Sequence, residues 1–232
     1  MLVLGIESST PVASVALVSA GGLKGEMTLN TGLTHSEQLL PLIDDLLRQT
    51  GCSLDKVEGI AVAGGPGSFT GLRIGMATAK GLAQGRGIPL AGVPTLKALA
   101  YRNAAGRGLV SALLNARRQE VYAALFRFED NALKQVLPAC AISPLQWAGK
   151  LDEYGEPVVL AGDGAAVYRE IWEKVLGSRA VFLPPVFSIA SAASVAWLGR
   201  EKLMDGQSDD LYRLKPDYIR PSEAQVKLEK LK

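Results

Sequence analysis

Apolar and polar residues follow two different periods along the first hundred residues. A nearly continuous apolar run at residues 1–7 predicts a buried strand, and residues 13–18 and 23–29 predict two more strands of an antiparallel meander. Leucines at helical spacing predict a helix over His35–Gln49, and the short apolar run Gly59–Ala63 predicts another buried strand. The first part of the chain therefore predicts the order meander, helix, strand.

A glycine-rich segment, GGPGSFTGLRIG, follows this strand at Gly64–Gly75, and five of its twelve residues are glycine. It leads into a second predicted helix over Leu72–Gln84. Glycine allows positive φ angles and close approach of another backbone. A strand, a glycine turn and a helix N-terminus together can hold an anion or a tightly packed neighbour. Both possibilities stay open at this point.

Two familiar phosphate-binding motifs do not fit the glycine segment. A Walker loop ends in Gly-Lys-Ser/Thr, but no lysine lies between Lys56 and Lys80. The dinucleotide fingerprint G-x-G-x-x-G needs one residue fewer than the spacing of Gly65, Gly67 and Gly71 provides. If the segment contacts a phosphate, it does so in another way.

The same order of elements begins again after residues 103–108, the best linker candidate. Leu109–Leu114 is apolar, a polar turn at Asn115–Arg118 follows, and residues 120–128 alternate as a strand. The fold class predicted is α/β, with two ribonuclease-H-like lobes of the actin, sugar kinase and heat-shock ATPase superfamily, each a mixed sheet with flanking helices. We expect the lobes at 1–106 and 107–232, with the tail from about 205 packing back on the first lobe.

Proteins of this architecture commonly bind ATP between their lobes, through turns that follow the first strands. Carboxylates there would hold Mg²⁺ or act as a base. Asn115, at the matching turn of the second lobe, is a neutral amide and cannot serve as a base. The sequence therefore predicts at most weak nucleotide contact, and an ATP-dependent small-molecule phosphotransferase is the alternative function. The candidate nucleotide contacts are Glu7, Ser8, Ser9, Thr10, Gly65, Gly67, Ser68, Gly162, Asp163 and Gly164.

Small residues four apart mark one face of the second predicted helix. Gly71, Gly75 and Ala79 share that face, and interior glycines destabilise a helix by about 1 kcal/mol each relative to alanine. Close approach of another helix, from this chain or from a partner, would compensate. We predict a helix-on-helix interface with another protein, and that Gly75→Leu abolishes it while the lobe stays folded. The predicted interface residues are His35, Leu39, Leu42, Ile43, Leu46, Gly71, Leu72, Gly75, Met76 and Ala79.

Composition narrows the function classes. With 232 residues, 48% hydrophobic, and a net charge of +2, the chain can bury a sizeable core and has no bulk attraction to nucleic acid. Cys52 and Cys140 are no disulfide framework, and no stretch reaches membrane-spanning length, so we expect a cytoplasmic protein. His35 is the single histidine, and its Thr-His-Ser-Glu context predicts a helix start rather than a metal ligand or a catalytic base. We therefore expect no metal site and no catalytic residue.

Five segments resemble one known family, TsaB (also called YeaZ), in order over essentially the whole chain. They are LGIESST at residues 4–10, residues 34–41, the glycine segment, residues 115–122 and PDYIRPS at residues 216–222. The family usually has Asp where this chain has Glu7, and often Asp in place of Asn115. Both departures weaken the case for catalysis further.

The resemblance implies a noncatalytic subunit of a tRNA-modifying complex. Such a subunit pairs with TsaD, and with the ATPase TsaE, to make threonylcarbamoyladenosine beside the anticodon in tRNAs that read codons beginning with A. It implies that the two first-lobe helices form the pairing surface, that ATP or ADP binds there weakly at most, and that tRNA is met only through the complex. A self-associating homodimer with regulatory duties is a further alternative, and the preference between a homodimer and the pair with TsaD stays open.

Overall fold

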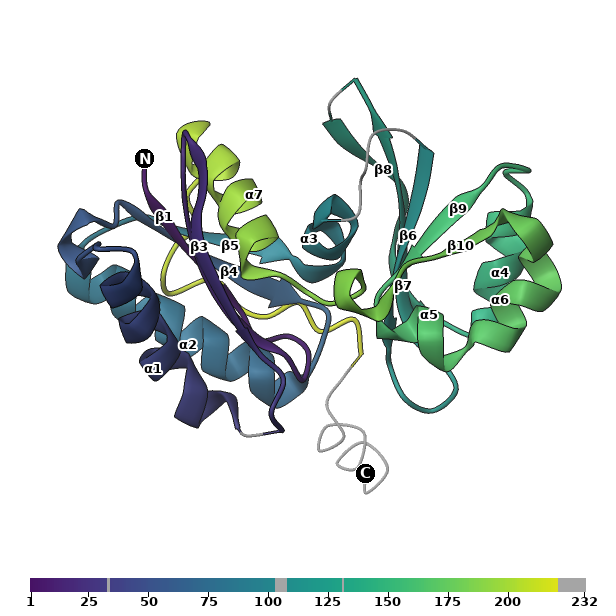
Figure 1. Cartoon of the computed structure of the whole chain (residues 1–232), viewed down its shortest axis with the longest axis horizontal. Helices are drawn as coiled ribbons and strands as arrows, with labels where there is room; N and C mark the ends of the chain where they lie inside the picture. The colour runs from purple at the N-terminus through teal and green to yellow at the C-terminus, as the bar shows by residue number, and fades with distance from the viewer. Residues whose placement is uncertain (33, 103–107, 131, 221–232) are drawn as a thin grey trace.

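The computed structural model describes residues 1–32, 34–102, 108–130 and 132–220. Two five-stranded sheets form two lobes that lie side by side (Figure 1). The first sheet has the order β3-β2-β1-β4-β5 and the second the order β10-β9-β6-β7-β8, which is the same arrangement when both start from the hairpin edge. In each lobe the central strand pairs antiparallel with the next strand and parallel with a later one. The predicted duplicated α/β architecture is confirmed.

The first lobe forms from apolar strands and amphipathic helices of the first hundred residues. Its cores contain leucine, isoleucine and valine side chains from both faces of the sheet. Its strands are β1 (Val3–Glu7), β2 (Ala13–Ser19), β3 (Gly22–Leu29), β4 (Gly59–Gly65) and β5 (Leu90–Pro94). Its helices from this part of the chain are α1 (His35–Gln49), α2 (Phe69–Arg86) and α3 (Thr95–Arg102), with a short 3₁₀ turn at Leu54–Lys56.

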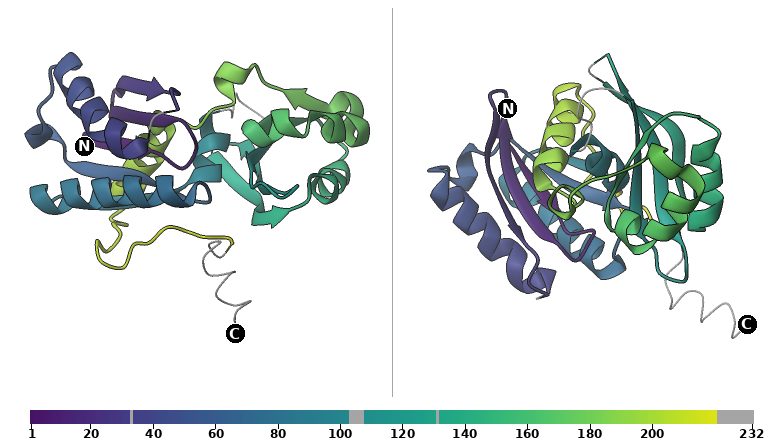
Figure 2. Two further views of the ribbon diagram at one scale, coloured as in Figure 1. Left: turned by 90° about the horizontal axis from the view of Figure 1, so that it is seen from below. Right: turned by 45° about the vertical axis from the view of Figure 1, so that its right-hand side comes forward.

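The second lobe repeats this plan with its helices on the sheet face that points away from the first lobe (Figure 2). Its strands are β6 (Gly108–Asn115), β7 (Val121–Glu129), β8 (Ala132–Ile142), β9 (Val158–Ala161) and β10 (Ala180–Phe182). Its helices are α4 (Pro144–Asp152), α5 (Asp163–Val167) and α6 (Arg169–Leu176), and 3₁₀ turns follow at Gly177–Arg179 and Pro185–Phe187. Tyr168 separates α5 from α6.

The last helix, α7 (Ala192–Met204), does not belong to the second lobe, although the sequence prediction placed in that lobe everything from residue 107 to the tail at about 205. It packs on the first sheet, on the face opposite α1 and α2 (Figure 1). Glycines explain this return, because a Cβ on Gly5 would lie 2.4 Å from the Ala192 carbonyl oxygen and one on Gly199 would lie 2.3 Å from Ala61 Cβ. The helix and the sheet approach each other at positions that carry no side chain.

A carboxylate from an edge strand holds the start of α7. Glu26 of β3 accepts hydrogen bonds from the Ser191 hydroxyl at 2.6 Å and from the Ala193 N–H at 3.1 Å. The Ser14 hydroxyl donates to the same oxygen, 3.2 Å away, and accepts from the Ala192 N–H. A negative charge at a helix N-terminus is favourable because the exposed N–H groups there carry partial positive charge.

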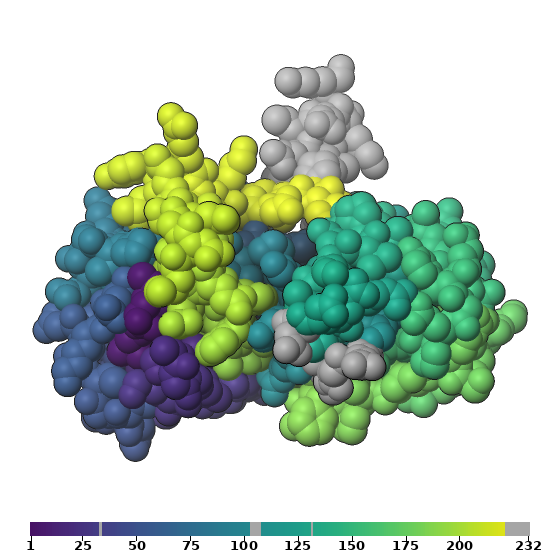
Figure 3. Space-filling view, turned by 90° about the horizontal axis from the view of Figure 1, so that it is seen from above, coloured from purple at the N-terminus to yellow at the C-terminus, as the bar shows by residue number. Residues whose placement is uncertain are grey.

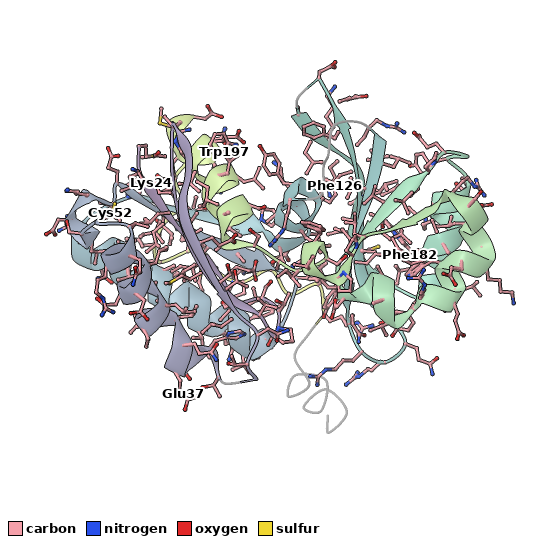
Figure 4. The ribbon with its side chains drawn as sticks, viewed as in Figure 1. Lys24, Glu37, Cys52, Phe126, Phe182 and Trp197 are labelled. Atoms are coloured by element: carbon pink, nitrogen blue, oxygen red, sulfur yellow. The ribbon has the colours of Figure 1, made fainter. Side chains whose placement is uncertain are left out.

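The two lobes share an apolar contact through α3. Leu96 and Leu99 of this helix pack with Val110, Ala124 and Phe126 of the second sheet. Figure 4 shows Phe126 on the part of the second lobe that faces the first, whereas Phe182 lies on the far side. The contact fixes the lobes around a joint core.

The tail after α7 lies along the first lobe and then reaches the second (Figure 3). The Asp209 N–H donates to the Leu90 carbonyl at 2.8 Å, and its carboxylate accepts from the Gly92 N–H and from Lys202. Further along, the Lys80 ammonium donates to the Leu214 carbonyl at 2.5 Å. The tail thus follows β5 and α2 toward the glycine segment.

Candidate functional site

The turn after β1 fills the space beside the glycine segment. A Cβ on Gly67 would lie 2.3 Å from the Ser9 carbonyl oxygen, and one on Gly71 would lie 2.0 Å from the Ser8 carbonyl oxygen. A Cβ on Gly75 would lie 2.1 Å from Ser8 Oγ, and that hydroxyl donates to the Gly71 carbonyl at 2.9 Å. These glycines therefore allow close approach of the chain to itself.

The N-terminus of α2 has partners within the chain. Ser68 caps the helix by accepting from the Gly71 N–H at 3.2 Å, and its own N–H donates to the Ser9 carbonyl at 2.6 Å. From the other side, the Asp217 N–H of the tail donates to the Gly64 carbonyl at 2.7 Å. Gly65 has a φ of 112°, and a Cβ there would lie 2.5 Å from the Asp217 carbonyl oxygen. The first-lobe residues predicted to contact nucleotide are thus brought together, and nucleotide contact itself stays a prediction.

Glu7 is a fully buried carboxyl at the end of β1. Its Oε1 accepts from the Ser9 N–H at 2.6 Å and from the Ser9 hydroxyl at 2.5 Å, while Oε2 is buried without a partner among the described residues. Burial raises the pKa of Glu7 to about 7, and the two hydrogen bonds from Ser9 act against this rise. Glu7 therefore keeps its proton up to about pH 7, well above the pH at which an exposed glutamate ionises.

Glu7 should make the protein's stability depend on pH. The folded-state pKa of about 7 lies above the ordinary pKa of 4.5 for a glutamate, so the unfolded chain releases this proton first as pH rises. The free energy of unfolding should fall by about 3 kcal/mol between pH 4.5 and pH 7 from this group alone. Urea unfolding of the wild type and of Glu7→Gln at several pH values isolates the effect, since the variant should lack this fall. Parallel pH curves for the two proteins would contradict the assignment.

His35 lies half-buried at the start of α1 beside the turn that follows β1. Its Nε2 is 2.8 Å from the Thr10 carbonyl oxygen, and its Nδ1 is buried without a partner in the described ranges. The Glu37 carboxylate accepts from the Thr34 N–H at 3.3 Å and from the Thr34 hydroxyl, as in the predicted capping arrangement. The structure thus places His35, predicted as an interface residue, against its own chain.

The turn at residues 162–164, where β9 leads into α5, packs against the end of β6. A Cβ on Gly162, whose φ is 107°, would lie 2.1 Å from the Leu113 carbonyl oxygen, and Gly164 faces the same residue. The Asp163 carboxylate accepts from the Asn115 N–H at 2.9 Å. Desolvation raises the pKa of Asp163, and this hydrogen bond acts against the rise. Through this hydrogen bond α5 is joined to Asn115, which ends β6 as Glu7 ends β1.

The structure corrects the predicted interface residues. Most of them face the first lobe's own core, because the apolar stripes of α1 and α2 cover the sheet. Gly71 and Gly75 are sealed against Ser8, so Gly75→Leu should disrupt folding rather than spare it. The core-facing residues from that prediction are Leu39, Leu42, Ile43, Leu46, Leu72, Met76 and Ala79.

The surface that these two helices offer to solvent is a different set, which we call the outer face. On α2 it contains Ala77, Gly81 and Gly85, again four apart, and no described atom lies within 4 Å of a Cβ built at either glycine. On α1 it includes Leu40, whose side chain is 57% exposed. The sequence also contains this second stripe of small residues, because Ala77, Gly81 and Gly85 are spaced four apart like Gly71, Gly75 and Ala79 but lie two positions out of step with them.

The described residues hold no group of three or more His, Cys, Asp or Glu side chains placed to bind a metal ion. The sequence has a single histidine, so its residues do not fit a metal site that takes two histidine ligands. None of the described helices is both long and apolar enough to cross a lipid bilayer.

Comparisons with known proteins agree with the fold and decide the family. Residues 26–228 match the model of the TsaD family, described as tRNA N6-adenosine threonylcarbamoyltransferase. The chain is 31% identical to the tRNA threonylcarbamoyladenosine biosynthesis protein TsaB of Bacillus subtilis, over 98% of this chain and 97% of that protein. The chain belongs to the TsaB family, within this TsaD-related group.

Solved structures support both the family and the fold. YeaZ from Pseudomonas aeruginosa, a TsaB-family structure, superposes with a TM-score of 0.81 and 27% identity, covering 94% of this chain and 99% of that one. ROK hexokinase from Thermus thermophilus shares only the fold, with a TM-score of 0.50, 13% identity, and coverage of 87% and 100%. The TsaB-family chain thus has the predicted superfamily fold.

Proposed function

We propose that this chain acts in tRNA threonylcarbamoyladenosine biosynthesis as a noncatalytic subunit that pairs with TsaD. The family and the name of the Bacillus subtilis relative support the pathway. Pairing uses the outer face of α1 and α2, TsaE joins the pair, and the complex works in the cytoplasm. The substrate is the adenosine next to the anticodon in tRNAs that read codons beginning with A.

The observation that carries the proposal is the open glycine pair on α2. Each interior glycine destabilises a helix by about 1 kcal/mol relative to alanine, and nothing in the described chain packs against Gly81 or Gly85. On α1, which covers the same sheet face as α2 (Figure 1), Leu40 exposes a large apolar side chain. Small residues on one helix let a partner helix approach closely, and an exposed apolar side chain on the other gives the partner apolar surface to cover. The residues proposed to contact the partner differ from those predicted from the sequence, but they lie on the same two helices.

The surroundings of the candidate carboxylates support the noncatalytic role. Glu7 is fully buried and accepts hydrogen bonds from Ser9, the matching position in the second lobe is the neutral Asn115, and the Asp163 carboxylate accepts from the Asn115 N–H. ATP or ADP, in this proposal, contacts the chain weakly and only at the interface with TsaD.

Sedimentation velocity of the purified chain with and without TsaD tests the proposal. We expect the chain alone to form a homodimer through the outer face, and TsaD to convert it into a heterodimer. A homodimer that refuses exchange with TsaD would contradict the proposal. Isothermal titration with ATP and Mg²⁺ tests the alternative, since tight binding with turnover by the isolated chain would favour a phosphotransferase.

A further inference from the structure

Arginines and aromatic rings lie together where the tail leaves the first lobe. The Tyr218 ring packs on the Phe69 ring at 4.7 Å between centroids, tilted by 32°. The Arg73 guanidinium lies 3.8 Å from the Phe69 ring centroid, and its Nε donates to the Tyr218 hydroxyl at 3.0 Å. Phe69 and Arg73 lie in the first turns of α2, and Tyr218 lies in the tail. The Arg73 side chain is exposed, and both rings are partly buried.

Arg220, two residues after Tyr218, attaches the tail to the second lobe. It forms an ion pair with Glu120 and donates to the Ala116 carbonyl at 3.3 Å, both in the turn between β6 and β7. Burial, and next the guanidinium of Arg118, lower the pKa of Arg220. Like charges therefore converge at this turn. Figure 1 shows the turn and the tail on the same lower side of the molecule.

The turn between β6 and β7 holds its arginines in an unfavourable backbone conformation. Arg117, Arg118 and Gln119 have φ angles of 58°, 51° and 61°, the left-handed region that residues with a Cβ rarely adopt in succession. Hydrogen bonds from Arg117 N–H to the Asn115 side chain and from Glu120 N–H to the Arg117 carbonyl, each 3.0 Å, hold it. Such strain concentrates at sites that bind ligands.

We propose that these residues form a surface that binds single-stranded RNA. The surface, called the arginine band, consists of Phe69, Arg73, Arg117, Arg118, Tyr218 and Arg220. The Arg220 guanidinium is already paired with Glu120 and holds the tail on the second lobe, so the other guanidinium groups of the band are the ones that suit phosphates. The partly exposed rings suit unstacked bases, and this combination is typical of single-strand binding. The Asp163 carboxylate accepts from the Asn115 N–H. The inference rests on the proposed function, which supplies an RNA substrate.

Fluorescence anisotropy with a labelled 17-nucleotide RNA stem-loop, at several salt concentrations, tests the arginine band. The protein is the full chain, alone and in complex with TsaD. Arg117→Gln/Arg118→Gln should weaken binding about tenfold at 0.1 M salt and reduce the slope of log affinity against log salt by about 1.4. Tyr218→Ala should weaken binding to the loop RNA but not to a fully paired RNA duplex.

Two control variants separate RNA binding from folding. Arg169→Gln removes an exposed arginine that stacks on the Phe182 ring, 4.1 Å from its centroid, outside the arginine band, and should leave affinity unchanged. Arg117→Gly relieves the left-handed backbone at φ 58°, so it should melt no lower than the wild type and still bind RNA less tightly.

Each outcome is decisive for the arginine band. Equal RNA affinity and salt slope for the double variant and the wild type, in a complex that still assembles, would overturn the inference and leave the proposed function standing. Loss of TsaD binding in the double variant, with RNA affinity unchanged, would make the surface a protein contact and also overturn it. Failure of the wild-type chain to pair with TsaD would instead count against the proposed function.

Discussion

Replacing Gly71 with alanine is expected to lower the free energy of unfolding by about 3 kcal/mol, because a well-packed site must accept an added methyl group. The added Cβ would lie 2.0 Å from the Ser8 carbonyl oxygen and 3.0 Å from the His35 ring. The Ser8 oxygen belongs to the backbone directly after β1, so it cannot rotate away. Urea unfolding followed by circular dichroism measures the loss.

Gly81→Ala on the same helix is the matched control. A Cβ at Gly81 meets no described atom within 4 Å, so the change should stabilise the protein by up to about 1 kcal/mol through helix propensity. Two glycines ten residues apart should thus respond to the same substitution in opposite directions. Equal effects at both positions would show that Gly71 is not enclosed by the turn after β1.

Gly81→Leu is expected to weaken pairing with TsaD at least about 30-fold, which corresponds to about 2 kcal/mol. The leucine would extend from the outer face into the space that a partner helix needs, while the lobe has room for it. Sedimentation velocity or biolayer interferometry with immobilised TsaD measures the change, and the melting temperature of the variant shows that it is folded.

Gly149→Leu provides the corresponding control in the second lobe. Gly149 is an interior glycine of α4, exposed, and also without a described atom within 4 Å of its Cβ position. The substitution should leave TsaD binding unchanged. If Gly149→Leu weakens binding as much as Gly81→Leu does, the partner surface does not lie on α1 and α2.

Strong periodicity predicted the elements and their duplicated order well. The apolar runs at β1 and β4 are buried on both faces, and the buried residues of α1 include Leu39, Leu42 and Leu46 at helical spacing, so their positions follow from the sequence. The return of α7 to the first lobe could not be predicted in this way. It depends on Gly5 and Gly199, whose packing partners are distant in sequence.

The sequence pattern does not tell which small residues of α2 are enclosed by the chain and which are open to a partner. A small-residue stripe marks close approach, but Gly75 meets its own chain and Gly81 meets none of the described residues. The stripes alone do not tell these cases apart, because both have the same spacing. The exposed Leu40 does separate the two faces once the core side of α1 is known. The ion pair from Arg220 to Glu120 is also invisible to local patterns, since it joins the tail to another lobe.

Cysteine protection tests the partner surface most directly. Ala77→Cys places a thiol on the outer face of α2, and Ala166→Cys places one on α5 of the second lobe, both in a chain whose Cys52 and Cys140 are replaced by serine. Saturating TsaD should slow maleimide labelling of the thiol on α2 at least tenfold and leave labelling on α5 unchanged. Unchanged labelling on α2, with a complex present, would contradict the assignment of the outer face.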